Sequence, residues 1–252
     1  MELKYRQRSI EFARIAHPYQ LSQMRFFDVG PYVDGSTCVT EFTEKQLICW
    51  VMGFEPARQL LFEELGFFGS DFYKCAVEEP FYSPGKGDID LVICRWQAPQ
   101  EAAAIEFKRV KITVDDPEHH QLNKLEETYK GVEQANRLHE SFRFYQTYLA
   151  IMIAIEASSQ EDTNIPCRGI DPAATPDYGQ TKTFKRIVEF PGREELQSDI
   201  GIVFFEVVQP SRISIDRRVT LRICVHHPSQ RRTQSDSVTN QIEMLLRGTR
   251  GG

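Results

Sequence analysis

Two short apolar runs that contain charged residues constrain the fold of this chain more than any other feature. The first covers Ile89–Cys94, and the second covers Ala103–Val110 after a loop centred on Pro99. Continuous apolar runs of this length are typical of strands that are buried on both faces. Such a sheet needs helices on each side, so the two runs predict an α/β fold.

Helical and strand patterns around these runs give the expected order of elements. One helix is predicted over Pro56–Phe68, and a long amphipathic helix is predicted over Gln121–Phe144. The order helix, strand, strand, strand, helix, strand in the middle of the chain predicts a sheet with helices packed on it. The other expected elements are helices over Ile10–Ala16, Thr43–Cys49 and Val238–Leu246, strands over Lys74–Val77, Tyr148–Ile155, Ile200–Val208 and Arg212–Val225, and a loop over Ser158–Gln180.

Composition narrows the class of protein. The net charge of -6 argues against a protein that coats nucleic acid through bulk charge, but it is compatible with an enzyme whose basic surface is local. The six cysteines lack zinc-site spacing, and the N-terminus lacks the apolar segment of a secretion signal. The longest apolar run, Leu149–Ile155, is too short to cross a bilayer. We therefore expect a cytoplasmic protein with no structural zinc and no membrane contact.

The charged residues inside the apolar runs form a pattern suited to a metal ion. Asp90 lies at the head of the first run, and Glu106 and Lys108 lie two apart in the second. Residues two apart on a strand share a face, so Glu106 and Lys108 are expected to point the same way. Buried charges are costly unless they are paired or bound to metal. Asp90 and Glu106, on neighbouring strands, would offer Mg²⁺ the carboxylate oxygens that it prefers.

This pattern has a structural and a catalytic interpretation. In the structural one, Asp90 caps a turn while Glu106 and Lys108 form a same-face salt bridge on an edge strand. In the catalytic one, a bound metal lowers the pKa of its water and stabilises charge on a phosphoryl group, while Lys108 orients the attacking water. The catalytic interpretation is favoured because the residues around all three charges are strongly apolar.

Asp90 followed by Glu106-x-Lys108 resembles the PD-(D/E)xK nuclease superfamily, which includes restriction enzymes, Holliday-junction resolvases and RecB-type exonucleases. The Gly-Asp-Ile-Asp-Leu-Val run and the Glu-Phe-Lys triplet are most similar to the RecB-like and resolvase-like branches. The resemblance implies a restriction-endonuclease-like core, with a mixed central sheet flanked by helices and with N- and C-terminal additions. The implied division is an N-terminal extension over 1–54, the nuclease core over 55–157, and a C-terminal extension of the same domain, with additional strands, over 158–252.

The resemblance also implies roles for individual residues in a Mg²⁺-dependent nuclease, with Mn²⁺ as a substitute metal. Asp90 and Glu106 would bind the metal, and Lys108 would position the water. The family often has a further acid on the first core helix. Glu63 and Glu64 are both candidates, and Glu64 is preferred as a third metal ligand because it lies amid apolar residues on the helical wheel. Some branches place a glutamine on the helix after the lysine strand, where Gln134 stands here.

The same resemblance implies DNA as the partner, and it admits a homodimer or a protein partner that supplies specificity. The alternative function is a catalytically inactive nuclease fold that binds nucleic acid or a protein. DNA against RNA, endonuclease against exonuclease, sequence specificity and the biological pathway all stay open at this point.

Overall fold

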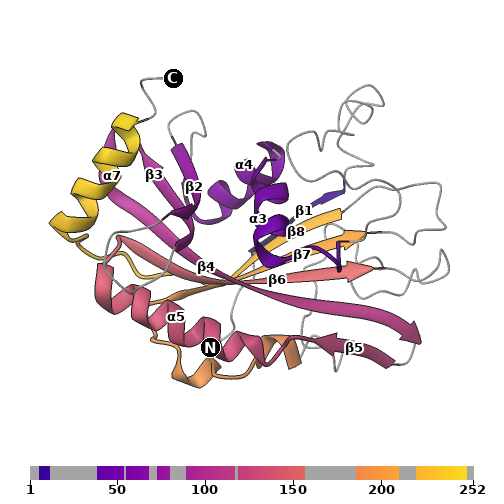
Figure 1. The fold of residues 1–252 in the computed structure, drawn as a ribbon. Helices are drawn as coiled ribbons and strands as arrows, with labels where there is room; N and C mark the ends of the chain where they lie inside the picture. Colours follow the sequence, from indigo (N-terminus) through magenta and orange to yellow (C-terminus); the bar gives the residue numbers. More distant parts are fainter. Residues whose placement is uncertain are drawn as a thin grey trace, which may run out of the picture.

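In the computed structural model, a mixed eight-stranded sheet forms the centre of the chain, in the order β1-β8-β7-β6-β4-β3-β2 with β5 paired to β4 (Figure 1). The structure describes residues 6–11, 39–53, 55–67, 73–79, 89–116, 119–156, 186–209 and 220–248. The strands are β1 (Arg6–Glu11), β2 (Tyr73–Glu79), β3 (Ile89–Arg95), β4 (Ala98–Asp116), β5 (His119–Asn123), β6 (Gln146–Glu156), β7 (Gly201–Gln209) and β8 (Thr220–His227). The helices are α3 (Glu44–Gly53), α4 (Glu55–Glu64), α5 (Glu127–Phe142), α7 (Asp236–Gly248) and the short 3₁₀ helix η3 (Arg193–Glu195).

β4 is the long strand that organises the sheet. Along one edge it pairs in parallel with β6, continuously from Ala103 to Thr113. Along the other edge it pairs antiparallel with β3 as far as Ile105 and antiparallel with β5 from Lys111 onward. Because β6 occupies the first edge, β3 and β5 must share the second one. A gap in the ladder of strand hydrogen bonds therefore lies between Ile105 and Lys111, on the β3 side of β4.

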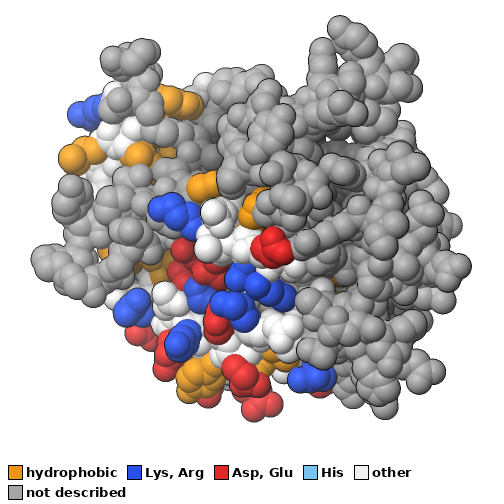
Figure 2. All heavy atoms as spheres, turned by 45° about the vertical axis from the view of Figure 1, so that its right-hand side comes forward, with side chains coloured by type: hydrophobic (Ala, Val, Ile, Leu, Met, Phe, Trp, Pro, Cys, Tyr) orange, Lys and Arg blue, Asp and Glu red, His pale blue; other side chains and the backbone are white. Residues whose placement is uncertain are grey.

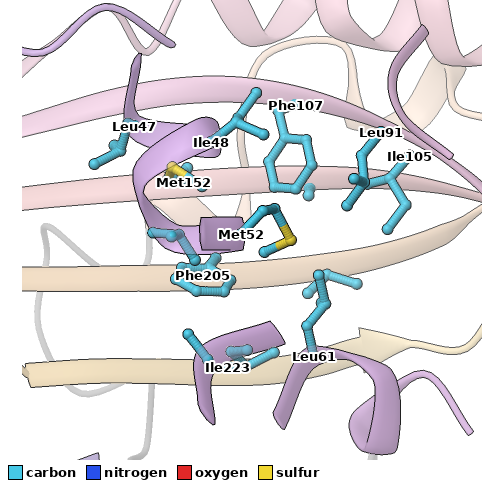
Figure 3. Packing of buried hydrophobic residues seen from close by; sticks show 14 of the residues in the cluster. Leu47, Ile48, Met52, Leu61, Leu91, Ile105, Phe107, Met152, Phe205 and Ile223 are labelled. Atoms are coloured by element: carbon cyan, nitrogen blue, oxygen red, sulfur yellow. The ribbon is translucent and has the colours of Figure 1, made fainter. Parts of the chain in front are cut away.

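Helices cover both faces of the sheet, as the apolar runs predicted. Side chains alternate along β4, so Ile105 and Phe107 pack in one hydrophobic cluster with α3 and α4. Ala104 packs on the other face with α5 and α7, and Val110 packs on that face with α5. Figure 3 shows Ile48 and Met52 of α3 close to Phe107 of β4. The chain is thus a mixed α/β protein whose central sheet is flanked by helices.

The structure confirms most of the expected elements and shifts others. The strands predicted over Lys74–Val77, Ile89–Cys94, Ala103–Val110 and Tyr148–Ile155 lie within β2, β3, β4 and β6. The strand predicted over Ile200–Val208 is β7, which begins one residue later, and the C-terminal helix is α7. The helix predicted over Gln121–Phe144 is wrong at its start, because 119–123 form β5, Lys124 turns the chain with a φ of 69°, and α5 begins only at Glu127.

Two further predictions concern segments that the structure describes only in part. The helix predicted over Ile10–Ala16 is wrong for Ile10 and Glu11, which form part of β1 and pair with β8, and 12–16 lie outside the described residues. Of the strand predicted over Arg212–Val225, the described part lies in β8. The predicted loop Ser158–Gln180 lies outside the described residues.

The sheet draws strands from all three predicted segments of the chain. β1 comes from the N-terminal extension, β2, β3, β4, β5 and β6 come from the predicted core, and β7 and β8 come from the C-terminal extension. Among the described residues, no helix is both long enough and apolar enough to cross a membrane.

Candidate active site

Carboxylates fill the gap in the hydrogen-bond ladder of β4. The backbone N–H of Phe107 donates to Oδ2 of Asp90 at 2.7 Å. The backbone N–H of Arg109 donates to Oε2 of Glu44 at 2.7 Å. These two N–H groups point toward the edge that β3 and β5 share, where no strand lies opposite them. The gap therefore brings a carboxylate from β3 and one from α3 to the same short stretch of β4.

Lys108 joins these acids from within β4. Its Nζ donates to Oε1 of Glu106 at 2.7 Å and to the carbonyl oxygen of Phe107 at 2.6 Å, and it lies 3.4 Å from Oε1 of Glu44. Glu106 and Lys108 are both buried, with 4% and 8% of their surface exposed. Their contact agrees with the expectation that residues two apart on β4 share a face. Lys108 is thus surrounded by acids and stripped of most of its water.

Glu44 is a functional candidate that no pattern in the sequence singles out. It is the first residue of α3, and a reciprocal capping box fixes the start of that helix. The N–H of Thr43 donates to Oε1 of Gln46 at 2.9 Å, and the N–H of Gln46 donates to the Thr43 hydroxyl at 3.2 Å. The Thr-x-x-Gln pattern marks a helix start in the sequence, but it carries no information about what that helix faces. Only the packing of α3 on β4 brings Glu44 to Lys108.

The contacts of Lys108 do not include Glu64, and the role of Glu64 as a third metal ligand stays a prediction. Among the described residues, the Nζ of Lys108 contacts Glu44, Glu106 and the Phe107 carbonyl, and Glu64 is absent from that set. Glu64 is half-buried at the end of α4, which packs mainly on α3, β8 and β1. Glu63, the other helix candidate, is exposed. The apolar surroundings that singled out Glu64 are explained by the packing of α4 over β8 and β1, which lie far from β3 in the strand order.

Helix α5 contributes to the site through a glycine. Gly131 of α5 lies against the stem of Lys108, and a Cβ added at Gly131 would come within 2.3 Å of Lys108 Cγ. This close approach lets the lysine stem pass under the helix to reach the acids. Gln134, one turn further along α5, is half-buried and makes no hydrogen bond to Glu106 or Lys108 among the described residues. Its supporting role stays a prediction.

The charges at the site are unbalanced in favour of acids. Burial, with the nearby negative charge of Asp90, raises the pKa of Glu106 to about 8 against the opposing charge of Lys108. Burial lowers the pKa of Lys108, but Glu106 and Glu44 together outweigh that effect and raise it above its usual value. Lys108 therefore stays protonated, while Glu106 holds a proton at neutral pH unless another cation approaches. Crowding carboxylates in this way costs stability, which is typical of sites that bind a ligand.

The donor chemistry of the site fits Mg²⁺ or Mn²⁺. Asp90 and Glu106 offer hard carboxylate oxygens, and burial together with the charge of Asp90 raises the pKa of Glu106. Among the described residues, no group of three or more His, Cys, Asp or Glu is arranged to hold a metal. Mg²⁺ commonly uses one or two protein carboxylates and completes its shell with waters and substrate phosphates, so a pair of acids meets that requirement.

Part of the described surface carries charges of both signs. Figure 2 shows acidic and basic side chains gathered in one area of the face that it presents. Comparison with known proteins adds no independent identification, because the sequence matches no protein-family model and no curated protein.

Proposed function

We propose that the protein is a metal-dependent phosphodiester hydrolase that cleaves DNA, on a restriction-endonuclease-like fold. The observation that carries the proposal is the convergence of three carboxylates and one lysine on the ladder gap of β4. Asp90 and Glu44 accept hydrogen bonds from the backbone there, and Glu106 and Lys108 contact each other at 2.7 Å. A buried ion pair by itself adds little net stability, so this concentration of charge has no adequate structural explanation.

The arrangement of elements around the site supports the same proposal. The chain runs from α4 through the antiparallel strands β2, β3 and β4, and then through α5 to β6, which is parallel to β4. This is the order of helix, three strands, helix and strand that the sequence patterns predicted. β5 is an insertion between the lysine strand and α5. Asp90 lies near the start of β3, and Glu106 and Lys108 lie in the middle of β4, just past the point where the two strands stop pairing.

The residues divide the chemistry between them. Asp90 and Glu106 would hold the metal, which supplies an activated water and neutralises charge on the phosphate. Glu106 must first release its proton, because its pKa is raised to about 8. Lys108, held by Glu106 and Glu44, would orient the attacking water and offset the charge that develops on the phosphoryl oxygens. Glu44 holds the lysine and the β4 backbone in place, and Gly131 gives the lysine stem its path.

A cleavage assay tests the proposal. Linear, circular and single-stranded DNA would be incubated with Mn²⁺, with Mg²⁺ or with EDTA, using the wild type, Asp90→Ala and Lys108→Ala. We expect metal-dependent cutting by the wild type and a loss of at least ~100-fold in each variant, with far-UV circular dichroism unchanged. The three DNA forms show whether a free end is needed.

Two results would contradict the proposal. Undiminished cutting by Lys108→Ala would remove the lysine from the chemistry. Failure of the wild type to cut any DNA would reject the activity on DNA, and a parallel arm with RNA would then separate a ribonuclease from a nuclease fold that only binds.

A further inference from the structure

Arg109 is the buried cation beside the candidate active site that none of the proposed chemistry uses. Only 6% of its surface is exposed, and its Nε and Nη1 atoms are buried without a hydrogen-bond partner among the described residues. Its main chain is well held, since its backbone N–H donates to Glu44 at 2.7 Å. The side chain therefore lies on a fixed backbone with two of its nitrogens, which carry three of its five N–H donors, unpartnered among the described residues.

An arginine in this state is costly to the folded protein. A guanidinium carries five N–H donors in a rigid planar fork and keeps its charge in proteins. Leaving buried donors unsatisfied carries a large desolvation cost, so nearly all such groups in folded proteins have partners. Burial lowers the pKa of Arg109, and Glu44 and Glu127 oppose that shift through their charges without contacting the guanidinium. Within the described part of the chain the buried donors thus have no acceptor, and a bound anion would supply one.

The position of Arg109 relative to the site defines what that acceptor is. Along β4, Arg109 lies on the opposite face from Glu106 and Lys108, because side chains alternate. One carboxylate links the two faces: Glu44 Oε1 lies 3.4 Å from Lys108 Nζ, while Glu44 Oε2 accepts from the Arg109 N–H. The Arg109 side chain and the Glu106–Lys108 pair therefore lie on opposite faces of one strand and are linked through Glu44.

We propose that Arg109 forms a phosphate-binding site that holds the substrate strand by a backbone phosphate next to the one being cleaved. The planar fork matches phosphate oxygens in a bidentate geometry, which a lysine cannot reproduce. The assignment of this phosphate to a nucleic-acid strand rests on the proposed function, whereas the anion site itself depends only on the geometry of Arg109. Asp90 and Glu106 would hold a cation and Arg109 would hold an anion, which are the two charges that a phosphodiester chain with a bound metal presents.

Inorganic phosphate tests the anion site without any cleavage. The melting temperature of the wild type would be measured in phosphate and in chloride of equal ionic strength, beside Arg109→Met and, as the matched control, Arg137→Met. Arg137 is an exposed arginine on α5. We expect phosphate to raise the melting temperature of the wild type and of Arg137→Met but not that of Arg109→Met. In chloride, Arg109→Met should melt at or above the wild-type temperature, because an apolar side chain replaces a buried cation without a partner.

DNA binding in EDTA tests the source of the phosphate. Arg109→Met should weaken binding to all sequences alike and reduce the slope of log affinity against log salt by about 1, while Arg109→Lys recovers the slope but not the full affinity. An equal phosphate shift in the wild type and Arg109→Met, or a marked loss of stability of Arg109→Met in chloride, would overturn the anion site. A phosphate shift that depends on Arg109, combined with unchanged DNA binding by Arg109→Met, would overturn the assignment to a nucleic-acid strand. Absence of cleavage by the wild type would count against the nuclease proposal and would leave the phosphate result standing.

Discussion

Arg232 and Arg109 are both arginines whose pKa is lowered by burial, yet they differ in whether their N–H donors have hydrogen-bond partners. Nε of Arg232 donates to the Phe144 carbonyl at 2.9 Å, Nη1 lies 2.9 Å from Nε2 of His139, and Nη2 donates to the His139 carbonyl oxygen. Arg109 has two buried nitrogens without a partner among the described residues. A satisfied fork joins parts of the fold, whereas an unsatisfied fork indicates a ligand.

The buried clusters around Arg232 and around Lys108 differ in the same way. Burial lowers the pKa of His139, and the charge of Arg232 lowers it further. The histidine is therefore neutral, and its Nε2 can accept a hydrogen bond from Arg232. Around Lys108 the neighbours are carboxylates of like charge, and the pKa of Glu106 rises to about 8 as a result of burial and of Asp90. The Arg232 cluster pairs a cation with neutral acceptors, whereas the Lys108 cluster holds several carboxylates close together. The comparison teaches that buried polar groups mark function where their charges or donors are left uncompensated.

Gly131→Ala should displace Lys108 from its contacts with Glu106 and Glu44, and it has the largest expected effect. An alanine normally stabilises a helix interior by about 1 kcal/mol over glycine, but here its Cβ would come within 2.3 Å of Lys108 Cγ. Displacing the lysine by about 1 Å should lower the cleavage rate by about 100-fold. Cleavage kinetics and urea unfolding would be measured together, with the exposed Arg137→Ala on the same helix as control. Unchanged cleavage by Gly131→Ala would show that the lysine path is not required.

Glu44→Gln and Glu64→Gln decide which helix acid serves the site. Glu44 contacts Lys108 and the β4 backbone, so the loss of its charge should weaken metal affinity or activity by about 10–100-fold. The amide can still accept from the Arg109 N–H, so we expect the fold to persist. Glu64→Gln should leave both quantities close to wild type. The reverse ranking in a Mn²⁺ titration would restore the acid that helical periodicity favoured.

Arg232→Met removes the arginine whose donors are satisfied, and it should lower stability without changing cleavage. Removing the fork leaves the carbonyl groups of His139 and Phe144 without their donor, at a cost of about 1–3 kcal/mol in unfolding free energy. Metal affinity and cleavage per folded molecule should match the wild type. A stability equal to wild type in urea unfolding would refute the structural role of this network.

Much of the site could be predicted from the sequence because its signals are local. Asp90, Glu106 and Lys108 interrupt apolar strands, and a spacing of two on a strand fixes a shared face. Glu44 escaped prediction because its contact with Lys108 joins residues 64 apart in the chain, and its only local signal is the capping box around Thr43. The role of Gly131 could not be predicted either, because the reason for a glycine inside a helix is visible only when the side chain packed against it is known.

The errors in the fold have similar physical causes. β1 is an edge strand rich in charged residues, so it lacks the apolar pattern by which buried strands are found. β5 was merged into the following helix because Leu122 and Leu125 have helical spacing, although Lys124 between them adopts a positive φ. In both cases the pairing partner, and not local preference, decides the structure.

The metal-free protein should lose stability as pH rises from about 4.5 to about 8, because Glu106 titrates over this range. The pKa of Glu106 is raised from 4.5 to about 8, so the folded state binds a proton that the unfolded state releases. This contribution is fully present below about pH 4.5 and is lost as pH rises toward about 8. Urea unfolding in EDTA checks the sign, and Glu106→Gln should remove this pH dependence. An unfolding free energy of the wild type that is constant across this range would contradict the raised pKa.

Mn²⁺ affinity, measured by calorimetry from about pH 6 to about pH 9 on the wild type and Glu106→Gln, tests most directly whether the cluster on β4 is a metal site. Binding must displace the Glu106 proton, so the wild-type affinity should rise about tenfold per pH unit up to about pH 8 and then level off. Glu106→Gln should bind far more weakly and without that rise. Absence of Mn²⁺ binding by the wild type, or equal binding by both proteins at every pH, would contradict the account.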